Sequence, residues 1–190
     1  VLDRTCFYPE GGGQPGDHGT LNGIPVVDTH EKDGLVLHDT KEPIEVGTEV
    51  KAVIDWDRRF DLTQQHSGEH MVSGVVHRIY GYDNVGFHMG ADMVTIDFSG
   101  ELTEQQLRDV EQEVNEKIWL DSPVKCWYPS PEELKGSPYR SKKELTGKVR
   151  IVEFPGADIC ACCGTHVAHT GEIGLVKILS VEKFHSGVRV

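Results

Sequence analysis

The sequence predicts an α+β protein in which a small N-terminal antiparallel β-barrel or meander packs on a larger α+β domain with an antiparallel sheet. Three observations support this fold class. Residues 1–55 contain short apolar runs separated by turn dipeptides, residues 57–80 and 103–121 show helical spacing of apolar side chains, and strand-like runs surround the helices. Strands and helices therefore segregate along the chain rather than alternate strictly, which is typical of α+β folds. A chain of 190 residues is long enough to bury a core.

Two dipeptides, Asn22-Gly23 and Asp33-Gly34, organise the N-terminal region. Each lies between strand-like runs, and type I′ hairpin turns need positive φ at both central positions. The predicted strands are 19–21, 24–30, 35–38 and 50–54. We therefore expect a glycine-rich β-barrel domain over residues 1–55, lacking its first strand, followed by a second, α+β domain over residues 56–190.

The second domain is expected to contain two long helices. Asp57 is a candidate cap for a helix that runs to about Tyr80 and ends at Gly81. Thr103 and Gln106 form a capping-box pattern before the second helix, which Pro123 stops. Further strands are predicted at 92–99, 124–128, 149–154 and 173–181, with a short helix starting near residue 130.

Composition narrows the class of protein. No apolar run approaches the roughly 18 residues of a membrane span, and no signal peptide is visible, so we expect no membrane association and a cytoplasmic protein. The five cysteines are odd in number and three are crowded together, which indicates a reducing compartment rather than a disulfide framework.

Charge is unevenly distributed along the chain. The net charge of −12 argues against a broad, non-specific nucleic-acid binder. Residues 135–150, however, carry six basic side chains against one acidic one. This basic strip suits a partner whose phosphates touch one edge of the protein, and a solvated loop is the alternative interpretation. The candidates for phosphate contact are Arg140, Lys142, Lys143 and Lys148.

Two histidines four residues apart, His66 and His70, lie in the middle of the first predicted helix. Side chains at this spacing project from the same helix face, so both imidazoles can reach one metal ion. With Glu69 the segment also reads H-x-x-E-H, the signature of inverzincin metalloproteases. The histidine pair alone leaves both interpretations and chance spacing open.

A second half-site, Cys162 with His166, lies between two predicted strands. One thiolate joined to three imidazoles makes a tetrahedral donor set that suits zinc. Cys160 and Cys163 compete for the thiolate position, and we interpret them instead as small buried thiols. The predicted metal ligands are His66, His70, Cys162 and His166.

The segment Phe7–Gly19 is unusually rich in glycine. Consecutive glycines let a backbone approach another surface and expose its N–H groups. The segment lacks the Gly-Lys-Ser/Thr ending of a phosphate-binding P-loop. We therefore expect a functional loop of another kind.

Three motifs together resemble the editing domain of alanyl-tRNA synthetases and the free-standing alanyl-tRNA editing proteins of the AlaX family. They are the glycine-rich Phe7–Gly19, the His66/His70 pair, and Cys162–Val167 followed by Thr170–Gly174. The similarity covers nearly the whole chain, and the absence of an aminoacylation module implies a free-standing editor. Some family members add a C-terminal module that promotes dimerisation, which would lie beyond Val190 and leaves the oligomeric state open.

The resemblance implies a hydrolase that deacylates tRNA(Ala) wrongly charged with serine or glycine, with Zn²⁺ as cofactor and tRNA as partner. It makes the two half-sites the zinc ligands and places the glycine-rich loop near the aminoacyl end. Where many relatives have a substrate-contacting Gln after the first helix, this chain has Asn84 and His88. The substrate-binding candidates are Gly11, Gly12, Gly13, Gln14, Asp17, Asn84, His88 and Thr165.

The catalytic candidates are His66, His70 and Glu69. A metal between the half-sites would hold a water or the substrate's amino group beside the ester carbonyl. Glu69 lies about 60° round the helix from His66. We expect it to orient a ligand or to face solvent, with a general-base role as the alternative.

Three other functions remain open from the residues. An H-x-x-E-H metalloprotease would need a downstream Glu as third ligand and would leave Cys162 and His166 unexplained. A threonyl-tRNA-type editing domain shares the two half-sites, but the glycine-rich loop argues against it. A non-catalytic, structural-zinc tRNA-binding module would have a closed site of four protein ligands.

Overall fold

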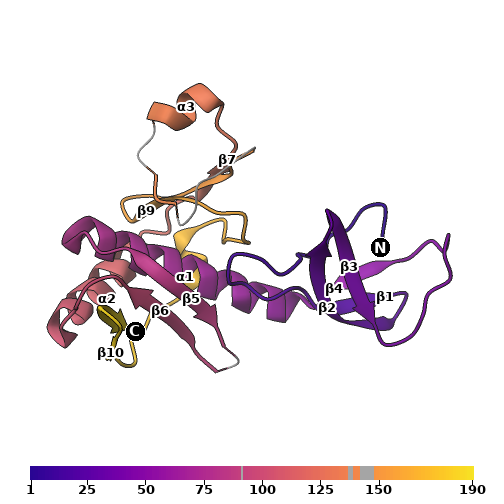
Figure 1. The fold of residues 1–190 in the computed structure, drawn as a ribbon, viewed down its shortest axis with the longest axis horizontal. Coiled ribbons are helices and arrows are strands. Elements are labelled where there is room, and N and C mark those ends of the chain that lie inside the picture. The colour runs from indigo at the N-terminus through magenta and orange to yellow at the C-terminus, as the bar shows by residue number, and fades with distance from the viewer. Residues whose placement is uncertain (91, 137–138, 142–147) are drawn as a thin grey trace. The chain divides into compact units, whose positions relative to one another are not determined.

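The structure is a computed structural model that describes residues 1–90, 92–136, 139–141 and 148–190 (Figure 1). It divides into two compact units, Val1–Thr63 and Gln64–Val190, so the first long helix contributes to both. In order, the helices and strands are β1 (Gly19–Leu21), β2 (Ile24–Lys32), β3 (Leu35–Thr40), β4 (Ala52–Ile54), α1 (Trp56–Tyr80), β5 (Asn84–Met89), β6 (Val94–Phe98), α2 (Glu104–Trp119), β7 (Lys125–Trp127), α3 (Pro131–Gly136), β8 (Ile151–Phe154), β9 (Asp158–Ala161), a 3₁₀ helix η1 (Thr170–Ile173), β10 (Glu182–Phe184) and β11 (Gly187–Arg189).

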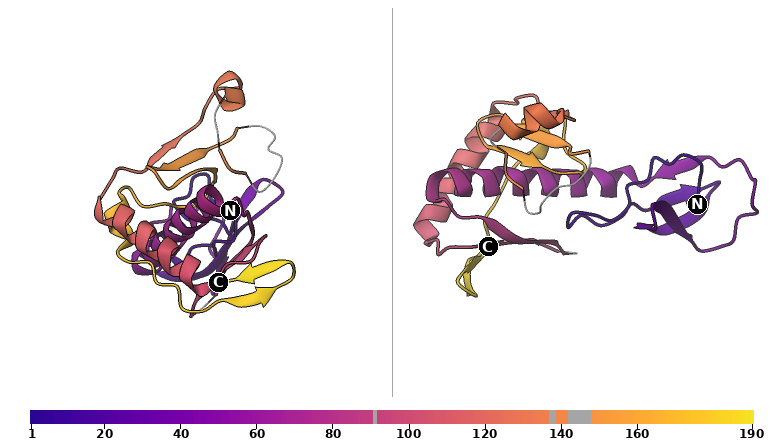
Figure 2. Two further views of the ribbon diagram at one scale, coloured as in Figure 1. Left: turned by 90° about the vertical axis from the view of Figure 1, so that its left-hand side faces the viewer. Right: turned by 45° about the horizontal axis from the view of Figure 1, so that its top comes forward.

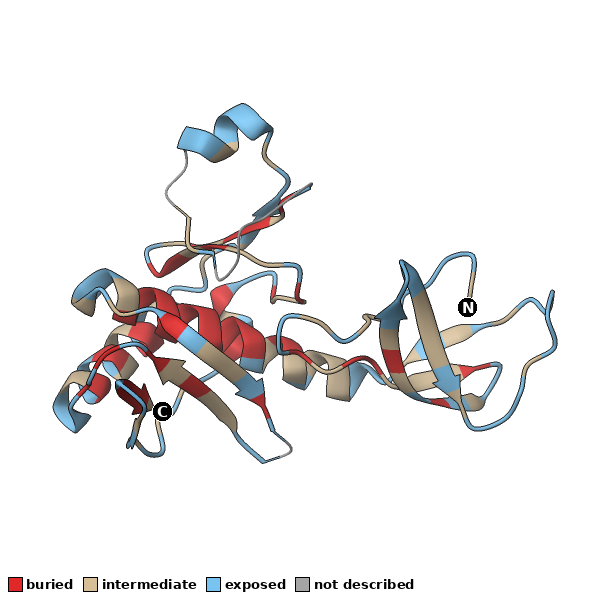
Figure 3. Cartoon of the chain, viewed as in Figure 1, coloured by how far each residue is buried: buried red, intermediate tan, exposed pale blue. Residues whose placement is uncertain are grey.

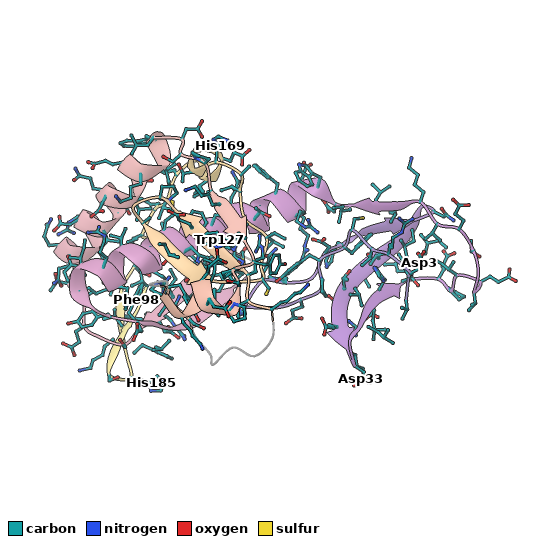
Figure 4. The ribbon with its side chains drawn as sticks, turned by 90° about the horizontal axis from the view of Figure 1, so that it is seen from above. Asp3, Asp33, Phe98, Trp127, His169 and His185 are labelled. Carbon is teal, nitrogen blue, oxygen red and sulfur yellow. The ribbon has the colours of Figure 1, made fainter. Side chains whose placement is uncertain are left out.

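The first unit contains an open antiparallel sheet in the order β3-β2-β1-β4. Both predicted hairpin turns are confirmed: Asn22 and Gly23 have φ of 50° and 84°, and Asp33 and Gly34 have φ of 53° and 76°. Asp33 marks the tip of the β2–β3 hairpin in Figure 4. Strands β1 to β3 form the expected meander. The closed barrel was wrong, because four strands, two of only three residues, are too few and too short to close a sheet on itself.

The second unit has two antiparallel sheets on opposite sides of α1 (Figures 1 and 2). One has the order β10-β11-β6-β5 and the other β7-β8-β9. Every α1 residue from 66 to 76 is buried, as the continuous red stretch in Figure 3 shows. A helix covered on all sides needs small residues where neighbours approach closely, and this stretch contains Ser67, Gly68, Ser73 and Gly74.

The core of the second unit is formed mainly by α1, α2 and the facing strands. Its buried members include Met71, Val72, Val75, Val76, Ile96, Phe98, Leu107, Val110, Val114, Ile118, Val152 and Phe154. The smaller core of the first unit consists of Phe7, Leu21 and Val26. Among the helices of the described residues, none combines the length and the apolar character needed to cross a membrane.

The helix ends follow local capping rules. The capping box of α2 is confirmed, since Thr103 Oγ1 accepts a hydrogen bond from the Gln106 N–H at 3.2 Å and Gln106 Oε1 accepts one from the Thr103 N–H at 2.8 Å. The predicted cap of α1 was wrong by two residues. Asp55 Oδ1 accepts from the Arg58 N–H at 3.2 Å, and Asp57 lies within the first turn. Gly81 ends the helix as predicted, with φ of 71°.

The predicted strand at 173–181 was also wrong. The chain there forms η1 and then an extended segment along α2. Its backbone bonds to α2 side chains: Val176 exchanges two hydrogen bonds with the Asn115 amide at 2.8 and 2.9 Å, and the Ile178 N–H donates to Glu111 Oε2 at 2.6 Å. Since helix side chains satisfy these groups, no neighbouring strand is required. Strands β5, β9 and β10 were not predicted.

Gly74 lets α1 lie against the start of β9, which leads to a stability prediction. A methyl group at this position would meet the Ala157 carbonyl and come within 2.5 Å of Asp158 Cβ. We expect Gly74→Ala to lower the free energy of unfolding by about 1–3 kcal/mol in urea titrations, because the added methyl overpacks the contact. Gly136→Ala in α3 is the control, because apart from its own helix backbone and chain neighbours the added methyl meets no atom of the described residues within 4 Å, and it should not lower stability. Equal stability of both variants would contradict this account.

Candidate metal centre

The two helix histidines project from the same side of α1, as their spacing predicts. His66 and His70 are 2% and 3% exposed, and their ring centroids are 5.2 Å apart. Two aromatic rings pack against these histidines. Phe87 lies with its centroid 5.4 Å from that of His66, and Phe154 stacks on His70 at 5.6 Å. Neither phenylalanine could be predicted to lie here, because the sequence of a strand does not show which residues an apolar side chain will pack against.

The second half-site lies in the loop after β9. The Arg150 guanidinium donates to the carbonyls of Cys162 and Gly164 at 3.0 and 2.8 Å, and the Gly164 N–H points at the Cys162 sulfur at 3.3 Å. The loop is fastened to α1 where the Val167 N–H donates to Ser67 Oγ at 3.2 Å. These contacts hold Cys162 and His166 over the helix histidines.

The four predicted ligand residues come together. One donor atom from each of His66, His70, Cys162 and His166 lies within 4.8 Å of all the others. Cys162 Sγ is 3.5 Å from His66 Nε2 and 3.3 Å from His166 Nε2. Three imidazole nitrogens around one sulfur form a donor set that can hold a metal ion. The cluster therefore fits the predicted ligand set.

The electrostatics of Cys162 and His166 favour metal ligation. Burial raises the pKa of the Cys162 thiol, but hydrogen bonds from His166, His66 and His70 outweigh it and lower the pKa to about 2. Burial, together with the charges of His70 and His66, lowers the pKa of His166 to about 3. A thiolate and a neutral imidazole are the forms in which cysteine and histidine bind metals.

The other two crowded thiols differ from each other. Cys160 is buried, as expected, and forms a second cluster with His70 and Asp158. Cys163 is exposed, so its interpretation as a buried thiol was wrong: the chain turns outward after Cys162. Neither belongs to the cluster with His66 and His166, which leaves Cys162 as the thiolate there.

Asp158 was not predicted to belong to the site. Its Oδ2 lies 3.0 Å from His70 Nδ1, and Arg140 donates two hydrogen bonds of 2.7 Å to its carboxylate. Burial raises the pKa of this carboxyl, but its bonds with His70 and Arg140 outweigh that effect and lower it. Burial lowers the pKa of His70, yet the charge of Glu69 and the bonds with Asp158 and two cysteines raise it well above its usual value.

Glu69 is buried, so the expectation that it faces solvent was wrong. Only 5% of it is exposed, because α1 is covered on this side too. Its Oε1 accepts hydrogen bonds from Ser73 Oγ at 2.6 Å and from the Asn84 amide, while Oε2 lies 3.9 Å from His70 Nε2. Asn84, predicted to contact substrate, is thus engaged with Glu69 and with Ser73 Oγ at 3.0 Å.

The glycine-rich segment is described within the first unit. Gly11 and Gln14 exchange backbone hydrogen bonds of 3.0 and 3.1 Å around Gly12 and Gly13, whose φ values are 62° and 88°. The side chains of Gln14 and Asp17 are not on the surface: the residues are 0% and 1% exposed. Asp17 forms an ion pair with Arg59 and accepts from the Tyr8 N–H at 2.7 Å. The polar groups of this segment therefore hold the loop in shape, and its glycines form the exposed turn.

The remaining candidates stay predictions. His88 is exposed on β5, and Thr165 is half-buried between Gly164 and His166. In the basic strip, Lys148 is exposed, the Arg140 side chain is only 14% exposed, and Lys142 and Lys143 lie outside the described residues.

Two family models match the chain. Residues 149–189, which include the Cys162/His166 half-site, match the "Threonyl and Alanyl tRNA synthetase second additional domain". Residues 1–58, which include the glycine-rich segment, match "tRNA synthetases class II (A)". These two matches relate the chain to domains of class II tRNA synthetases.

Individual relatives narrow this class. The chain is 39% identical over 192 residues to the alanyl-tRNA editing protein AlaX-L of Pyrococcus horikoshii, covering 96% of this chain and 48% of that protein. It is 35% identical over 187 residues to alanyl-tRNA editing protein Aarsd1 of Mus musculus, covering 96% and 45%. An alanine–tRNA ligase of Halobacterium salinarum is 36% identical over 200 residues, covering 99% and 21%. Over nearly its whole length the chain is similar to alanyl-tRNA editing proteins, and it spans about half the length of the curated editing proteins it matches.

Proposed function

We propose that the protein is a zinc-dependent hydrolase that deacylates mischarged tRNA(Ala), with Ser-tRNA(Ala) as the preferred substrate and Gly-tRNA(Ala) as a second one. The observation that carries the proposal is the buried cluster of three imidazoles and one thiolate in a chain that is similar to alanyl-tRNA editing proteins. The donor set fits zinc because sulfur and imidazole are the ligands that this ion prefers. His66, His70, Cys162 and His166 would hold it.

Zinc, when bound, supplies Lewis acidity toward the ester carbonyl and its attacking water. The chain's own groups do the rest. Glu69 accepts the proton of the water at Oε2, and Ser73 and Asn84 hold the carboxylate in place. The water oxygen bonds to the carbonyl carbon, the ester C–O bond breaks, and the ribose oxygen leaves as a hydroxyl with the proton that Glu69 took from the water. Phe87 and Phe154 line the histidines and limit the access of other water.

Selectivity for serine over alanine would come from polar groups that pair with the serine hydroxyl. A site that hydrogen-bonds a substrate hydroxyl rejects an analogue without it, because its polar groups stay unpaired. Thr165, beside the ligand His166, and His88 are the candidates. We assign the chemistry to residues 56–190, and tRNA recognition to the glycine-rich domain 1–55 and the basic strip.

A deacylation assay tests the function. The zinc-loaded protein is mixed separately with seryl-, glycyl- and alanyl-tRNA(Ala) and with seryl-tRNA(Thr), and release of the amino acid is followed. We expect fast release from seryl-tRNA(Ala), slower release from glycyl-tRNA(Ala) and little from the other two. Preference for seryl-tRNA(Thr) would instead indicate threonyl-type editing, and hydrolysis of peptides alone would indicate a metalloprotease.

One observation favours a second function, a structural-zinc tRNA-binding module. Four protein donors usually make a closed structural site, whereas catalytic zinc keeps a position for water or substrate. For deacylation one ligand must yield or the coordination must expand. A protein that binds zinc and tRNA but releases no amino acid from any of the four substrates would support this second function.

A further inference from the structure

On one side of the metal cluster, the Asp158 carboxylate links His70 to Arg140. The Asp158 side chain is 1% exposed and the Arg140 side chain 14%. Asp158 Oδ2 takes part in both the 3.0 Å contact with His70 Nδ1 and a 2.7 Å bond from Arg140 Nη2, and Oδ1 accepts from Arg140 Nε at 2.7 Å. Both carboxylate oxygens are therefore occupied by fixed partners.

Arg140 is itself held by backbone hydrogen bonds. Its N–H donates to the Ile159 carbonyl at 2.8 Å, and its carbonyl accepts from the Ala161 N–H at 2.9 Å. These two bonds place Arg140 alongside β9, the strand that begins with Asp158. The planar guanidinium then meets the carboxylate with two parallel bonds, a geometry that fixes direction as well as distance.

The consequence for His70 follows from the two nitrogens of the ring. A carboxylate held beside Nδ1 keeps the proton on that nitrogen and leaves the lone pair of Nε2 available for a metal. His166 lacks such support: its Nδ1 is buried without a hydrogen-bond partner among the described residues. Asp158 therefore fixes the tautomer and the ring orientation of His70 through Nδ1, on the side of the ring away from Nε2.

We infer that Asp158 and Arg140 are positioning residues of the metal centre, which hold His70 with Nε2 toward the metal and so raise metal affinity. The inference rests on the proposed function only in requiring that the cluster hold zinc. It gives Arg140, a candidate for phosphate contact by sequence, a role inside the protein instead.

The same residues have one competing explanation. His70, Asp158 and Cys160 lie close enough to hold a metal of their own. The two hydrogen bonds from Arg140 argue against this second metal site, because a cation would have to displace a guanidinium that already binds both oxygens of the Asp158 carboxylate. The stoichiometry of bound zinc separates the two explanations.

The experiment measures zinc affinity of the whole chain by competition with a chromophoric chelator, for the wild type, Asp158→Asn and Arg140→Lys. The matched control is Asp97→Asn, because Asp97 forms an equally bidentate pair with Arg189, at 2.7 and 2.8 Å, but touches none of the four ligand residues in the described structure. Thermal unfolding of each metal-free protein records any general loss of stability. Absorption spectra of the Co²⁺ forms report the ligand geometry.

We expect Asp158→Asn to weaken zinc binding by about 10–100-fold and to change the Co²⁺ spectrum. Arg140→Lys should weaken binding in the same direction but less, since lysine cannot make the two-pronged contact. Asp97→Asn should leave affinity and spectrum unchanged. If Asp158→Asn does not fold, the zinc affinity of Arg140→Lys tests the inference in its place.

Three outcomes would overturn the inference. They are wild-type affinity in the folded Asp158 and Arg140 variants, an equal loss of affinity in Asp97→Asn, or two zinc ions in the wild type of which Asp158→Asn loses one. Failure of the proposed function is visible separately. In that case the wild type itself binds no zinc, or binds zinc but deacylates no tRNA.

Discussion

Cys162→Ala is expected to remove tight zinc binding and to slow deacylation of seryl-tRNA(Ala) by about 10³-fold or more. The sulfur is the one anionic donor among the four, and hydrogen bonds from His166, His66 and His70 hold its pKa at about 2. Without it, three neutral imidazoles remain, and a site without metal loses several kcal/mol of charge stabilisation in the transition state. About 4 kcal/mol corresponds to 10³ in rate.

The control for this change is the neighbouring thiol. Cys163 is exposed and lies outside the cluster, so Cys163→Ala should keep both zinc and activity. Zinc content is measured after dialysis against a weak chelator, and initial rates are measured on the same samples. A folded Cys162→Ala protein with the native deacylation rate would falsify the role of this metal centre.

Glu69→Gln is expected to slow deacylation by about 10²–10⁴-fold while zinc stays bound, which is the range for loss of a general base. The substitution keeps the shape of the side chain. Its remaining carbonyl oxygen can still accept from Ser73 and Asn84 in the place of Oε1, and an NH₂ group replaces Oε2, the atom 3.9 Å from His70 Nε2. The variant therefore removes the proton-accepting oxygen but keeps the hydrogen bonds from Ser73 and Asn84.

Zinc content and unfolding free energy must be measured with the rate. Glu113→Gln is a suitable comparison, because Glu113 pairs with Arg78 and Lys117 away from the metal ligands. Should Glu69→Gln keep the native rate, the carboxylate only orients its neighbours. Should it lose zinc as well as activity, its role is to support His70 rather than to move a proton.

Features that depend on neighbours in sequence could be predicted. The Asn22-Gly23 and Asp33-Gly34 hairpins and the Thr103/Gln106 capping box are confirmed, since each depends on φ angles or hydrogen bonds within a few residues. The cap of α1 was misplaced, because Asp55 and Asp57 are equally good capping residues and the sequence does not rank them. The segment 173–181 has a strand-like sequence but finds its hydrogen-bond partners on α2.

The candidate site divides in the same way. The i, i+4 spacing of His66 and His70 and the Cys162/His166 pair were visible in the sequence, because each half-site is local. The sequence by itself thus determined the candidate donor residues, the two hairpins and the family resemblance.

Only the tertiary structure decided what surrounds those ligands. Asp158 reaches His70 across 88 positions of the chain, Arg140 turns inward to Asp158, and Glu69 is buried with Ser73 and Asn84. From sequence alone, a charged side chain is expected to be exposed unless its partner is known. Here the partners come from separate strands and loops that fold against α1. Burying a carboxylate costs free energy unless hydrogen bonds and opposite charge offset it, so the packing around α1, and no local pattern, determines where Glu69 and Asp158 lie.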